Sequence, residues 1–422
     1  MKITGIIAEY NPFHNGHLYH LEKTRQITGA GHIVVVMSGD FTQRGAPALV
    51  DKYTRTRMAL ACGADLVLEL PVIHATGSAS YFARGAVALL HNLKAVDCLC
   101  FGSESARPED LARIGQAIRQ ELPLFQKNLR GYLSTGDTFP LARHKALRDC
   151  LGDVPLSKGL LDSPNNILGL EYCMAIQDFA SPIQPVVIRR KGAAYHQTKP
   201  DGTFSSATAI RRIIEQNAPF SDWSSHIPAP AAKILADALY KRGWMGANDF
   251  SLLLRYKCME TPPEKSCRYF DVSEEMANRI CNCLNGFTDY ESFITQIKTK
   301  QITHTRAARG LLHILLDLYQ PAPRPSACAV TPYARILGFR QGAAPLLTHL
   351  KKTSRIPLVS RPAKSLKNDR LLDTDARAML DADIHAANLY ESVLAHKSGT
   401  PFVHEACRPI VIYPDHPPTS NS

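Results

Sequence analysis

The chain has 422 residues, of which 45% are hydrophobic and 21% are charged. This composition is typical of a folded globular protein and excludes an intrinsically disordered one, and the length predicts two or three domains. The N-terminus leads directly into a short apolar segment, so we expect neither a signal peptide nor a membrane span. The 11 cysteines include no C-x-x-C pair, which favours buried thiols in a cytoplasmic protein over disulfides or a metal site.

The formal net charge of +11 is unevenly distributed along the chain. Residues 1–100 contain nine Lys and Arg against seven Asp and Glu, whereas no acidic residue lies between Asp317 and Asp369. That acid-free stretch contains nine basic residues, which are Arg324, Arg335, Arg340, Lys351, Lys352, Arg355, Arg361, Lys364 and Lys367. Such segregation is typical of a protein that binds a polyanion. A solvated basic surface is the alternative, but we favour a nucleic acid partner.

The first half of the chain alternates short apolar runs with helical patterns. The runs at 3–7, 32–37, 65–70, 97–101 and 185–190 lack polar alternation, as expected for strands that are buried on both faces. Helical patterns occupy 16–27, 52–62, 79–92 and 108–121. We therefore predict an α/β domain over residues 1–215, with a doubly wound parallel sheet and right-handed crossovers. Residues from about 123 to 180 are helix-rich and form an insertion or a cover.

The character of the sequence changes after residue 215. Segments 229–242, 273–285, 287–299 and 304–319 are amphipathic and helical, so residues 216–320 are predicted to form an α-helical domain. The stretch P-A-P-R-P at 321–325 cannot continue a helix and indicates a linker. Residues 321–422 are then predicted to form a basic C-terminal region of mixed structure, with one strand-like segment at 409–413.

The segment N-P-F-H-N-G-H at 11–17 follows the first predicted strand and begins a helix. In a doubly wound sheet this loop lies at the carboxyl edge of the strands, where ligands bind. The N-terminus of the helix suits a phosphate, and Gly16 allows close approach of the backbone. His14 and His17 lie on one side of the first turn, so both can stabilise charge on an α-phosphate. Helix-capping or core histidines are the alternative. We expect ATP contacts from this loop at Ile7, Ala8, Glu9, Asn11, Phe13, Gly16 and His20.

Other segments fit the same nucleotide site. Gly102 ends the fourth predicted strand, which we expect beside the first, although it is also an ordinary strand-to-helix glycine. Asn165, in S-P-N-N, can contact the base or ribose or form an Asx turn. Basic residues at the end of the fifth strand suit a triphosphate as well as a solvated surface. These predicted ATP contacts are Gly102, Asn165, Arg189 and Arg190.

Two further segments extend the site. The segment S-A-T-A-I-R at 206–211 begins a helix and adds the predicted ATP contacts Ser206, Thr208 and Arg211. The segment S-G-D-F-T-Q-R-G at 38–45 follows the second strand and places Asp40 and Arg44 near the reacting centre. Arg44 can bind a small carboxylate or pair locally with Asp40.

The histidine segment resembles the HIGH motif of a nucleotidyltransferase superfamily that shares this loop with the class I aminoacyl-tRNA synthetases. Segment 206–211 resembles the S-S-T-x-I-R signature of that superfamily, with Ala207 in place of the second serine. The further segments G-I-I-A-E-Y, M-S-G-D-F-x-Q-R-G, F-G-S-E and S-P-N-N-I-L-G-x-E-Y make the chain similar to the bacterial tRNA(Met) cytidine acetate ligases. This resemblance is strong over residues 1–215 and looser beyond them.

The resemblance implies a two-step reaction. ATP and free acetate give acetyl-adenylate and pyrophosphate, and the acetyl group then passes to N4 of the wobble cytidine of elongator tRNA(Met). His14 and His17 are expected to stabilise the transition state, with Asp40 and Arg44 at the acetate end. Mg²⁺ is expected to arrive bound to ATP, and the basic stretch 324–367 is expected to hold tRNA. The alternatives are an adenylyltransferase that makes a dinucleotide cofactor and a non-catalytic RNA-binding protein with a degenerate nucleotide fold.

Overall fold

A computed structural model describes residues 1–104, 108–120, 122–137, 139–151, 163–189, 205–321, 326–367 and 371–415. Arg190 and Arg324, and most of the predicted linker at 321–325, lie outside the described residues. Among the described helices, none is long and apolar enough to cross a membrane. All 11 cysteines are free thiols.

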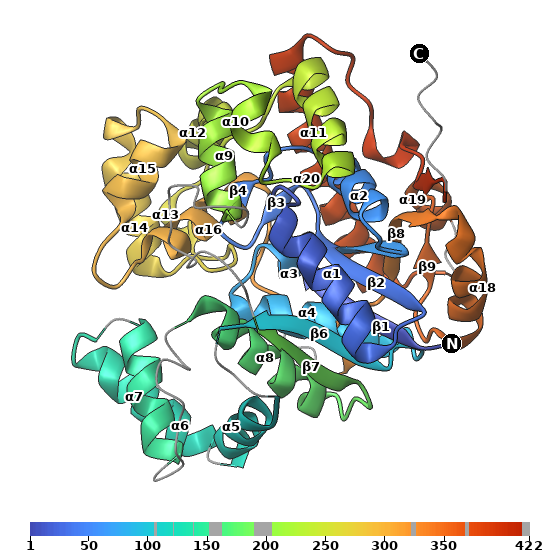
Figure 1. Ribbon diagram of the computed structural model, residues 1–422. Helices are drawn as coiled ribbons and strands as arrows, with labels where there is room; N and C mark the ends of the chain where they lie inside the picture. The colour runs from blue at the N-terminus through green and yellow to red at the C-terminus, as the bar shows by residue number, and fades with distance from the viewer. Residues whose placement is uncertain are drawn as a thin grey trace.

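A mixed sheet of eight strands in the described part of the chain forms the centre of the molecule (Figure 1). The strand order is β10-β8-β5-β2-β1-β6-β7, with β9 beside β8. Strands β5, β2, β1, β6 and β7 are parallel, whereas β8 runs antiparallel to β5. These strands are β1 (Ile3–Ala8), β2 (His32–Ser38), β5 (Leu66–Leu70), β6 (Cys98–Ser103), β7 (Gln184–Arg189), β8 (Ala334–Arg340), β9 (Leu358–Val359) and β10 (Val411–Tyr413). A separate hairpin pairs β3 (Phe41–Thr42) with β4 (Ala46–Pro47).

Helices cover both faces of the sheet, which confirms the doubly wound fold of the first half. Ile33 and Val35 pack with α1 (Asn15–Thr28), α2 (Lys52–Ala61) and α11 (Ala229–Arg242). Val34 and Val36, which point to the opposite face, pack with α4 (Ala79–Asn92), α5 (Pro108–Gln120) and α8 (Pro164–Asp178). Alternate residues of a buried strand thus serve two cores, and this explains the uninterrupted apolar runs of the sequence.

The remaining helices lie around this core. Those of the first half are α3 (Val72–Ala75), α6 (Leu122–Ser134) and α7 (Phe139–Leu151), the last two forming the projection at the lower left of Figure 1. A second group contains α9 (Ala207–Glu215), α10 (Phe220–Ser224), η1 (Ala247–Phe250), α12 (Ser251–Glu260), α13 (Pro263–Ser266), α14 (Glu274–Cys283), η2 (Leu284–Gly286), α15 (Tyr290–Ile297) and α16 (His304–Leu315). The C-terminal helices are α17 (Ala327–Val330), η3 (Gln341–Ala343), α18 (Ala344–Thr353), α19 (Pro362–Leu366), α20 (Thr374–Ser398) and η4 (Glu405–Cys407).

The C-terminal third is part of the central sheet, which differs from the separate basic region that the sequence predicts. Strand β8 pairs with β5, and β10 extends the sheet beyond β8. Helix α11, expected within the α-helical domain, packs on the sheet through Ala231 and Leu235. The core of η1 to α16 also includes Ala386, Tyr390 and Leu394 of α20. Long-range pairing therefore joins segments that local patterns separate.

Four buried charges join α2, β5, β8 and η4. Lys52 Nζ lies 2.7 Å from Glu69 Oε1 and 2.8 Å from Glu405 Oε1. Arg335 Nε lies 3.2 Å from Glu69 Oε2, and its guanidinium also pairs with Glu405. Burial opposes the charged form of Glu405, but Lys52 and Arg335 outweigh it and lower its pKa to about 2. The prediction of Arg335 as a tRNA contact is wrong, because its side chain is 2% exposed and is neutralised inside the protein.

Replacing one member of this network is expected to destabilise the fold. Lys52→Met removes the two ion pairs with Glu69 and Glu405 and leaves one buried carboxylate in excess, so the free energy of unfolding should fall by about 3–5 kcal/mol. Urea unfolding measures this change. Lys364→Met, at an exposed position of α19, is the control and should change stability by less than about 0.5 kcal/mol. Equal unfolding midpoints for the two variants would contradict the role given to the network.

A buried histidine fastens α16 to the α/β core. His313 is fully buried, with Nδ1 2.8 Å from the carbonyl oxygen of Phe270 and Nε2 3.1 Å from Oγ1 of Thr76. Burial lowers the pKa of His313 to about 4, so the ring is neutral at neutral pH.

The His313 contribution to stability is expected to be lost in mild acid. Between pH 6.5 and about 4 the His313 imidazole is protonated in the unfolded chain but stays neutral in the folded protein. The free energy of unfolding therefore falls by up to about 3 kcal/mol as the pH is lowered through this range. Urea unfolding at pH 7 and pH 5 measures the loss. His313→Gln, which does not titrate, should show a smaller loss between the same two pH values. An identical pH dependence in both proteins would rule out this source.

Candidate active site

A cavity of about 280 Å³ lies at the carboxyl edge of the parallel strands, where the sequence predicts the nucleotide site. The HIGH-type loop, the β3–β4 hairpin, the end of β6, α8 and the start of α9 surround it. Of the predicted residues, the cavity is lined by Ile7, Ala8, Glu9, Asn11, His14, Gly16, His17, His20, Arg44, Gly102, Asn165, Ser206, Thr208 and Arg211. Residues separated by some 200 positions thus meet in one site.

His14 and His17 form a reciprocal cap at the start of α1. Nδ1 of His14 accepts a hydrogen bond from the backbone N–H of Gly16 at 3.0 Å. Nδ1 of His17 accepts one from the backbone N–H of His14 at 3.2 Å. A ring nitrogen that accepts carries no proton, so each neutral imidazole has its proton on Nε2. The two rings stack with centroids 3.7 Å apart, and both line the cavity. The capping alternative is therefore correct, and it is compatible with catalysis because it fixes the donor atom of each ring.

Gly16 is required by this cap. A Cβ atom at position 16 would lie 2.8 Å from Cε1 of His14 and 3.0 Å from its Nδ1. Any side chain would therefore displace the imidazole that caps the helix. Both the cap and the close approach of the backbone to a ligand depend on the absence of a side chain here.

A second helix begins at the same cavity. Oγ of Ser206 accepts a hydrogen bond from the backbone N–H of Ala209 at 3.1 Å and so caps α9. Ala207 and Thr208, in the first turn of α9, line the cavity. The positive ends of α1 and α9 thus both face one cavity, which suits a polyphosphate. Because backbone N–H groups supply this attraction, Ala207 does not remove it.

Two guanidinium groups approach Thr208 inside the cavity. Arg211 donates to the carbonyl oxygen of Asn11 at 2.7 Å and to Thr208 Oγ1 at 3.3 Å. Arg44 Nη1 lies 3.5 Å from the same hydroxyl. The side chain of Asn11 accepts from the backbone N–H of Leu49 at 2.8 Å, so the loops after β1 and β2 hold each other. The arrangement brings two positive charges beside the histidine pair.

The end of β6 forms the opposite wall, since β6 pairs with β1 as predicted. Gly102 lines the cavity there, and Asn165 donates to Oε1 of Glu104 at 2.5 Å. Asn166 is buried and accepts from Oγ of Ser103 at 2.5 Å, so it holds the strand end rather than a ligand. The apolar residues Phe82, Phe101, Leu168 and Tyr172 complete this wall. They are suited to the flat face of an adenine.

Three predicted site residues lie outside the cavity lining. Asp40 is 6% exposed and accepts from the backbone N–H of Lys52 at 2.7 Å, which corrects its expected place at the reacting centre. Burial raises the pKa of Asp40 to about 7 even though Lys52 opposes this. Phe13 is fully buried and packs against Tyr10, because an apolar ring gains most in the core. Arg189 is exposed and pairs in register with Ser103 at the strand end.

Several lining residues were missed by sequence reasoning. Thr42, Ala46 and Pro47 come from the β3–β4 hairpin, and the motif around Arg44 was an available signal for them. Leu168 and Tyr172 lie in the S-P-N-N-I-L-G-x-E-Y segment, which was likewise an available signal for them. Phe82 lies on α4, whose apolar face otherwise forms the core, so its local pattern does not distinguish it. Among the described residues, no group of three or more His, Cys, Asp and Glu could hold a metal ion.

Comparison with known proteins places this geometry in a class. The family model of the HIGH nucleotidyl transferases matches residues 1–401. The chain therefore belongs to the HIGH nucleotidyl transferases, a class defined by this histidine loop on a doubly wound sheet.

Similar proteins define the family more narrowly. The tRNA(Met) cytidine acetate ligase of Alkaliphilus metalliredigens is 38% identical over 401 residues, which cover 92% of this chain and 94% of that protein. The ligase of Caldanaerobacter subterraneus is 39% identical and covers 94% of this chain and 96% of its own length. A crystal structure of Thermotoga maritima TmcAL with alpha-thio ATP has a TM-score of 0.89, at 29% identity over 98% of this chain and 100% of that one. The chain belongs to the tRNA(Met) cytidine acetate ligase family.

The double role of His14 can be separated by substitution. His14→Asn keeps a side-chain acceptor for the helix N-terminus but removes the Nε2 donor, so stability should stay within about 0.5 kcal/mol of the native protein. His14→Ala removes the cap and should lower the free energy of unfolding by about 1 kcal/mol. Urea unfolding distinguishes the two. Equal losses in both variants would show that the cap is not what stabilises this helix.

Proposed function

We propose that this protein activates acetate with ATP and then acetylates N4 of the wobble cytidine of elongator tRNA(Met). Membership of the tRNA(Met) cytidine acetate ligase family supports the substrates. The observation that carries the proposal is the cavity where the capped N-termini of α1 and α9 and the cations of Arg44 and Arg211 meet. ATP and tRNA are both cytoplasmic, so this is the proposed location.

In the first step a carboxylate oxygen of acetate attacks the α-phosphorus of ATP in line. The bond from the α-phosphorus to the bridging oxygen breaks, and pyrophosphate leaves with its electron pair. Nε2–H of His14 and of His17 donate to the α-phosphate and the bridging oxygen, where negative charge grows. Mg²⁺ bound to ATP would offset negative charge on the leaving pyrophosphate.

The walls of the cavity orient the reactants. The apolar side at Gly102, Phe101 and Tyr172 receives the adenine, and Asn165 contacts the nucleoside. Arg44, on the hairpin after β2, is placed to pair with the acetate carboxylate. Asp40 is buried behind the hairpin, so it orients the chain and does not touch acetate.

In the second step the exocyclic N4 amine of cytidine attacks the acetyl carbon of acetyl-adenylate. The mixed anhydride bond breaks, AMP leaves, and the amine loses a proton to solvent. An exocyclic amine of cytosine is a weak nucleophile, and the anhydride compensates for this. A wobble base lies in a single-stranded loop and reaches a cavity at little cost.

The proposed tRNA contacts that remain from the sequence prediction lie on the C-terminal elements. Lys351 and Lys352 are exposed on α18, and Lys364 is exposed on α19. Arg355, Arg361 and Lys367 are also exposed, whereas Arg340 lies 3.7 Å from Asp415. These positions lie at the end of β8 and in the segments that follow it along the chain.

Acetate-dependent exchange of pyrophosphate into ATP tests the first step. His14→Asn should lower the exchange rate about 100- to 1,000-fold, because one transition-state donor is lost while the fold is kept. The double charge reversal of Lys351 and Lys352 to Glu is the matched control. It should leave exchange unchanged and weaken tRNA binding in a filter or mobility assay. Exchange that needs no acetate, or that proceeds equally well in His14→Asn, would refute the proposed reaction.

A further inference from the structure

A second hollow, the α2–α11 groove, lies next to the cavity. It has a volume of about 570 Å³ and is bordered by α2, α11, Leu394 of α20 and Arg408 after η4. The loop after β4 is the wall between the two hollows, since Ala46 and Pro47 line the cavity and Val50 lines the groove. This wall is fixed, because Leu49 accepts a hydrogen bond from the backbone N–H of Met245 at 2.9 Å. The linings of the groove and of the cavity are therefore separated along the chain at this wall only by Ala48 and Leu49.

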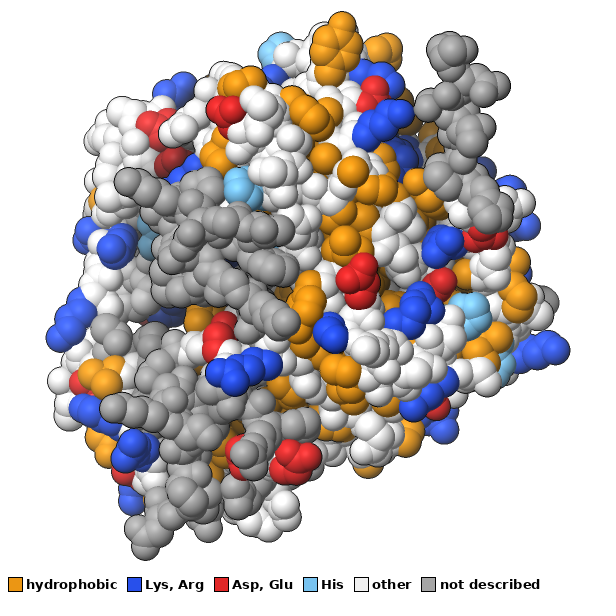
Figure 2. All heavy atoms as spheres, viewed as in Figure 1, with side chains coloured by type: hydrophobic (Ala, Val, Ile, Leu, Met, Phe, Trp, Pro, Cys, Tyr) orange, Lys and Arg blue, Asp and Glu red, His pale blue; other side chains and the backbone are white. Residues whose placement is uncertain are grey.

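The groove carries an excess of positive charge. Its lining includes the cations Arg57, Lys233, Lys241, Arg242 and Arg408, against the acids Asp51 and Asp237. Figure 2 shows several Lys and Arg side chains, interspersed with hydrophobic ones, at the upper right of the molecule near the position of α11 and α2 in Figure 1.

The acids near the groove already have partners. Arg242 and Arg408 share one carboxylate, Glu391, at 2.9 and 2.6 Å. Asp51 accepts from the backbone N–H groups of Tyr53 and Thr54, so it caps α2. The charge of the groove is thus only partly balanced within the protein.

Two cations of the groove are available to a ligand. Lys233 is exposed and makes no hydrogen bond or ion pair with any described residue. Arg57 is exposed, and its guanidinium donates to Oγ1 of Thr54 at 2.9 Å. Its charge helps to lower the pKa of the Asp51 carboxyl, but no carboxylate lies within ion-pair distance of it among the described residues. The Lys241–Asp237 pair is too exposed to hold Lys241 firmly, with 64% and 58% of the side chains accessible. The groove therefore presents mobile donors suited to phosphate oxygens.

An aromatic ring stands on the same helix face. Tyr240 is 92% exposed, so the face of its ring is open to a stacking partner. It lies seven residues after Lys233 and three after Asp237, so all three share one side of α11. Cations that follow a groove beside an exposed ring are the pattern by which proteins bind single-stranded nucleic acid.

We propose that the α2–α11 groove binds the sugar–phosphate backbone of the tRNA beside the base that enters the cavity, and that Tyr240 stacks on an unpaired base of the same loop. Arg57 and Lys233 contact phosphates, and the shared wall at 46–51 sets the short path from groove to cavity. This inference rests on tRNA being the acceptor, as proposed above. The groove would be a second tRNA-binding surface, in addition to the basic residues of the acid-free stretch.

The test measures tRNA binding against salt concentration for Arg57→Glu/Lys233→Glu. Affinity should fall at least about tenfold, and the slope of log affinity against log salt should become smaller by about two, one for each lost phosphate contact. Lys298→Glu/Lys300→Glu, at exposed positions after α15, makes the same charge change away from the groove and should bind normally. Arg57→Gln/Lys233→Gln should also bind weakly, which shows that repulsion is not the whole effect.

Substitution of Tyr240 provides an independent test of the proposal. Tyr240→Ala should weaken tRNA binding about 5- to 100-fold, whereas Tyr240→Phe, which keeps the stacking face, should stay within about twofold. Tyr256→Ala, at a ring that is 54% exposed on α12, is the control. Acetate-dependent pyrophosphate exchange should be unchanged in every groove variant.

The outcomes separate the two proposals. Failure of the native protein to bind or acetylate tRNA would refute the proposed function. A native protein that acetylates tRNA, with groove variants that keep its affinity and salt slope, would overturn the groove inference alone. Groove variants that lose exchange together with tRNA binding would also overturn it, since the residues would then support the cavity and not an RNA contact.

Discussion

The ion network of Lys52, Glu69, Arg335 and Glu405 is the constraint on which the rest of the structure depends. Charges this deeply buried are tolerated only when each has a partner of opposite sign. The partners come from α2, β5, β8 and η4, so the network forms only when the C-terminal third has joined the sheet. A Cβ atom at Gly39 would lie 2.5 Å from Oε1 of Glu69, so the loop after β2 is fitted directly against the network. That loop leads into the hairpin that carries Arg44.

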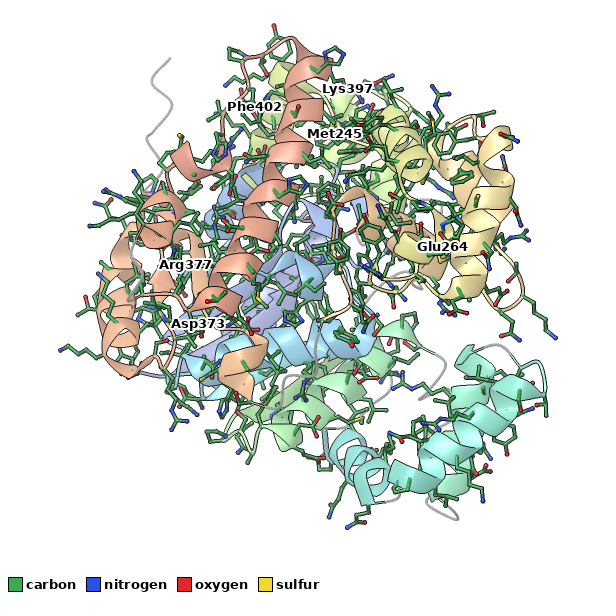
Figure 3. All side chains as sticks on the ribbon, turned by 180° about the vertical axis from the view of Figure 1, so that it is seen from behind. Met245, Glu264, Asp373, Arg377, Lys397 and Phe402 are labelled. Atoms are coloured by element: carbon green, nitrogen blue, oxygen red, sulfur yellow. The ribbon has the colours of Figure 1, made fainter. Side chains whose placement is uncertain are left out.

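The hairpin is held from its other side by the helical part of the protein. Gly45 has a positive φ of 75°, and a Cβ atom there would lie 2.4 Å from the backbone nitrogen of Arg309 in α16. Asn15, within the histidine loop, donates to the carbonyl oxygen of Ser225 at 2.9 Å. Figure 3 shows from behind how α20 runs along the sheet and the helical part. The loops that line the cavity are thus positioned by segments distant in sequence.

Each histidine of the pair uses one ring nitrogen for folding and the other for the proposed chemistry. Each Nδ1 satisfies a backbone N–H at the start of α1, and this leaves each Nε2 proton as the donor. A donor whose tautomer is fixed by the fold needs no reorganisation when charge develops on a phosphate. The two stacked rings and the N-terminus of α9 place several such fixed donors around one small cavity.

The sequence by itself determined the strands and crossover helices of the first half and most of the residues that line the cavity. These signals are local: uninterrupted apolar runs, a histidine loop between a strand and a helix, and capping residues such as Ser206. Only the tertiary structure decided that β8 pairs with β5, that Arg335 is buried, and that Asp40 is buried and accepts from the backbone N–H of Lys52. The place of Phe82 in the cavity lining was equally unpredictable. The physical reason is that a charged side chain such as Arg335 can be buried only if partners such as Glu69 and Glu405 lie beside it. These partners are far from Arg335 along the chain, so no local sequence pattern indicates the pairing.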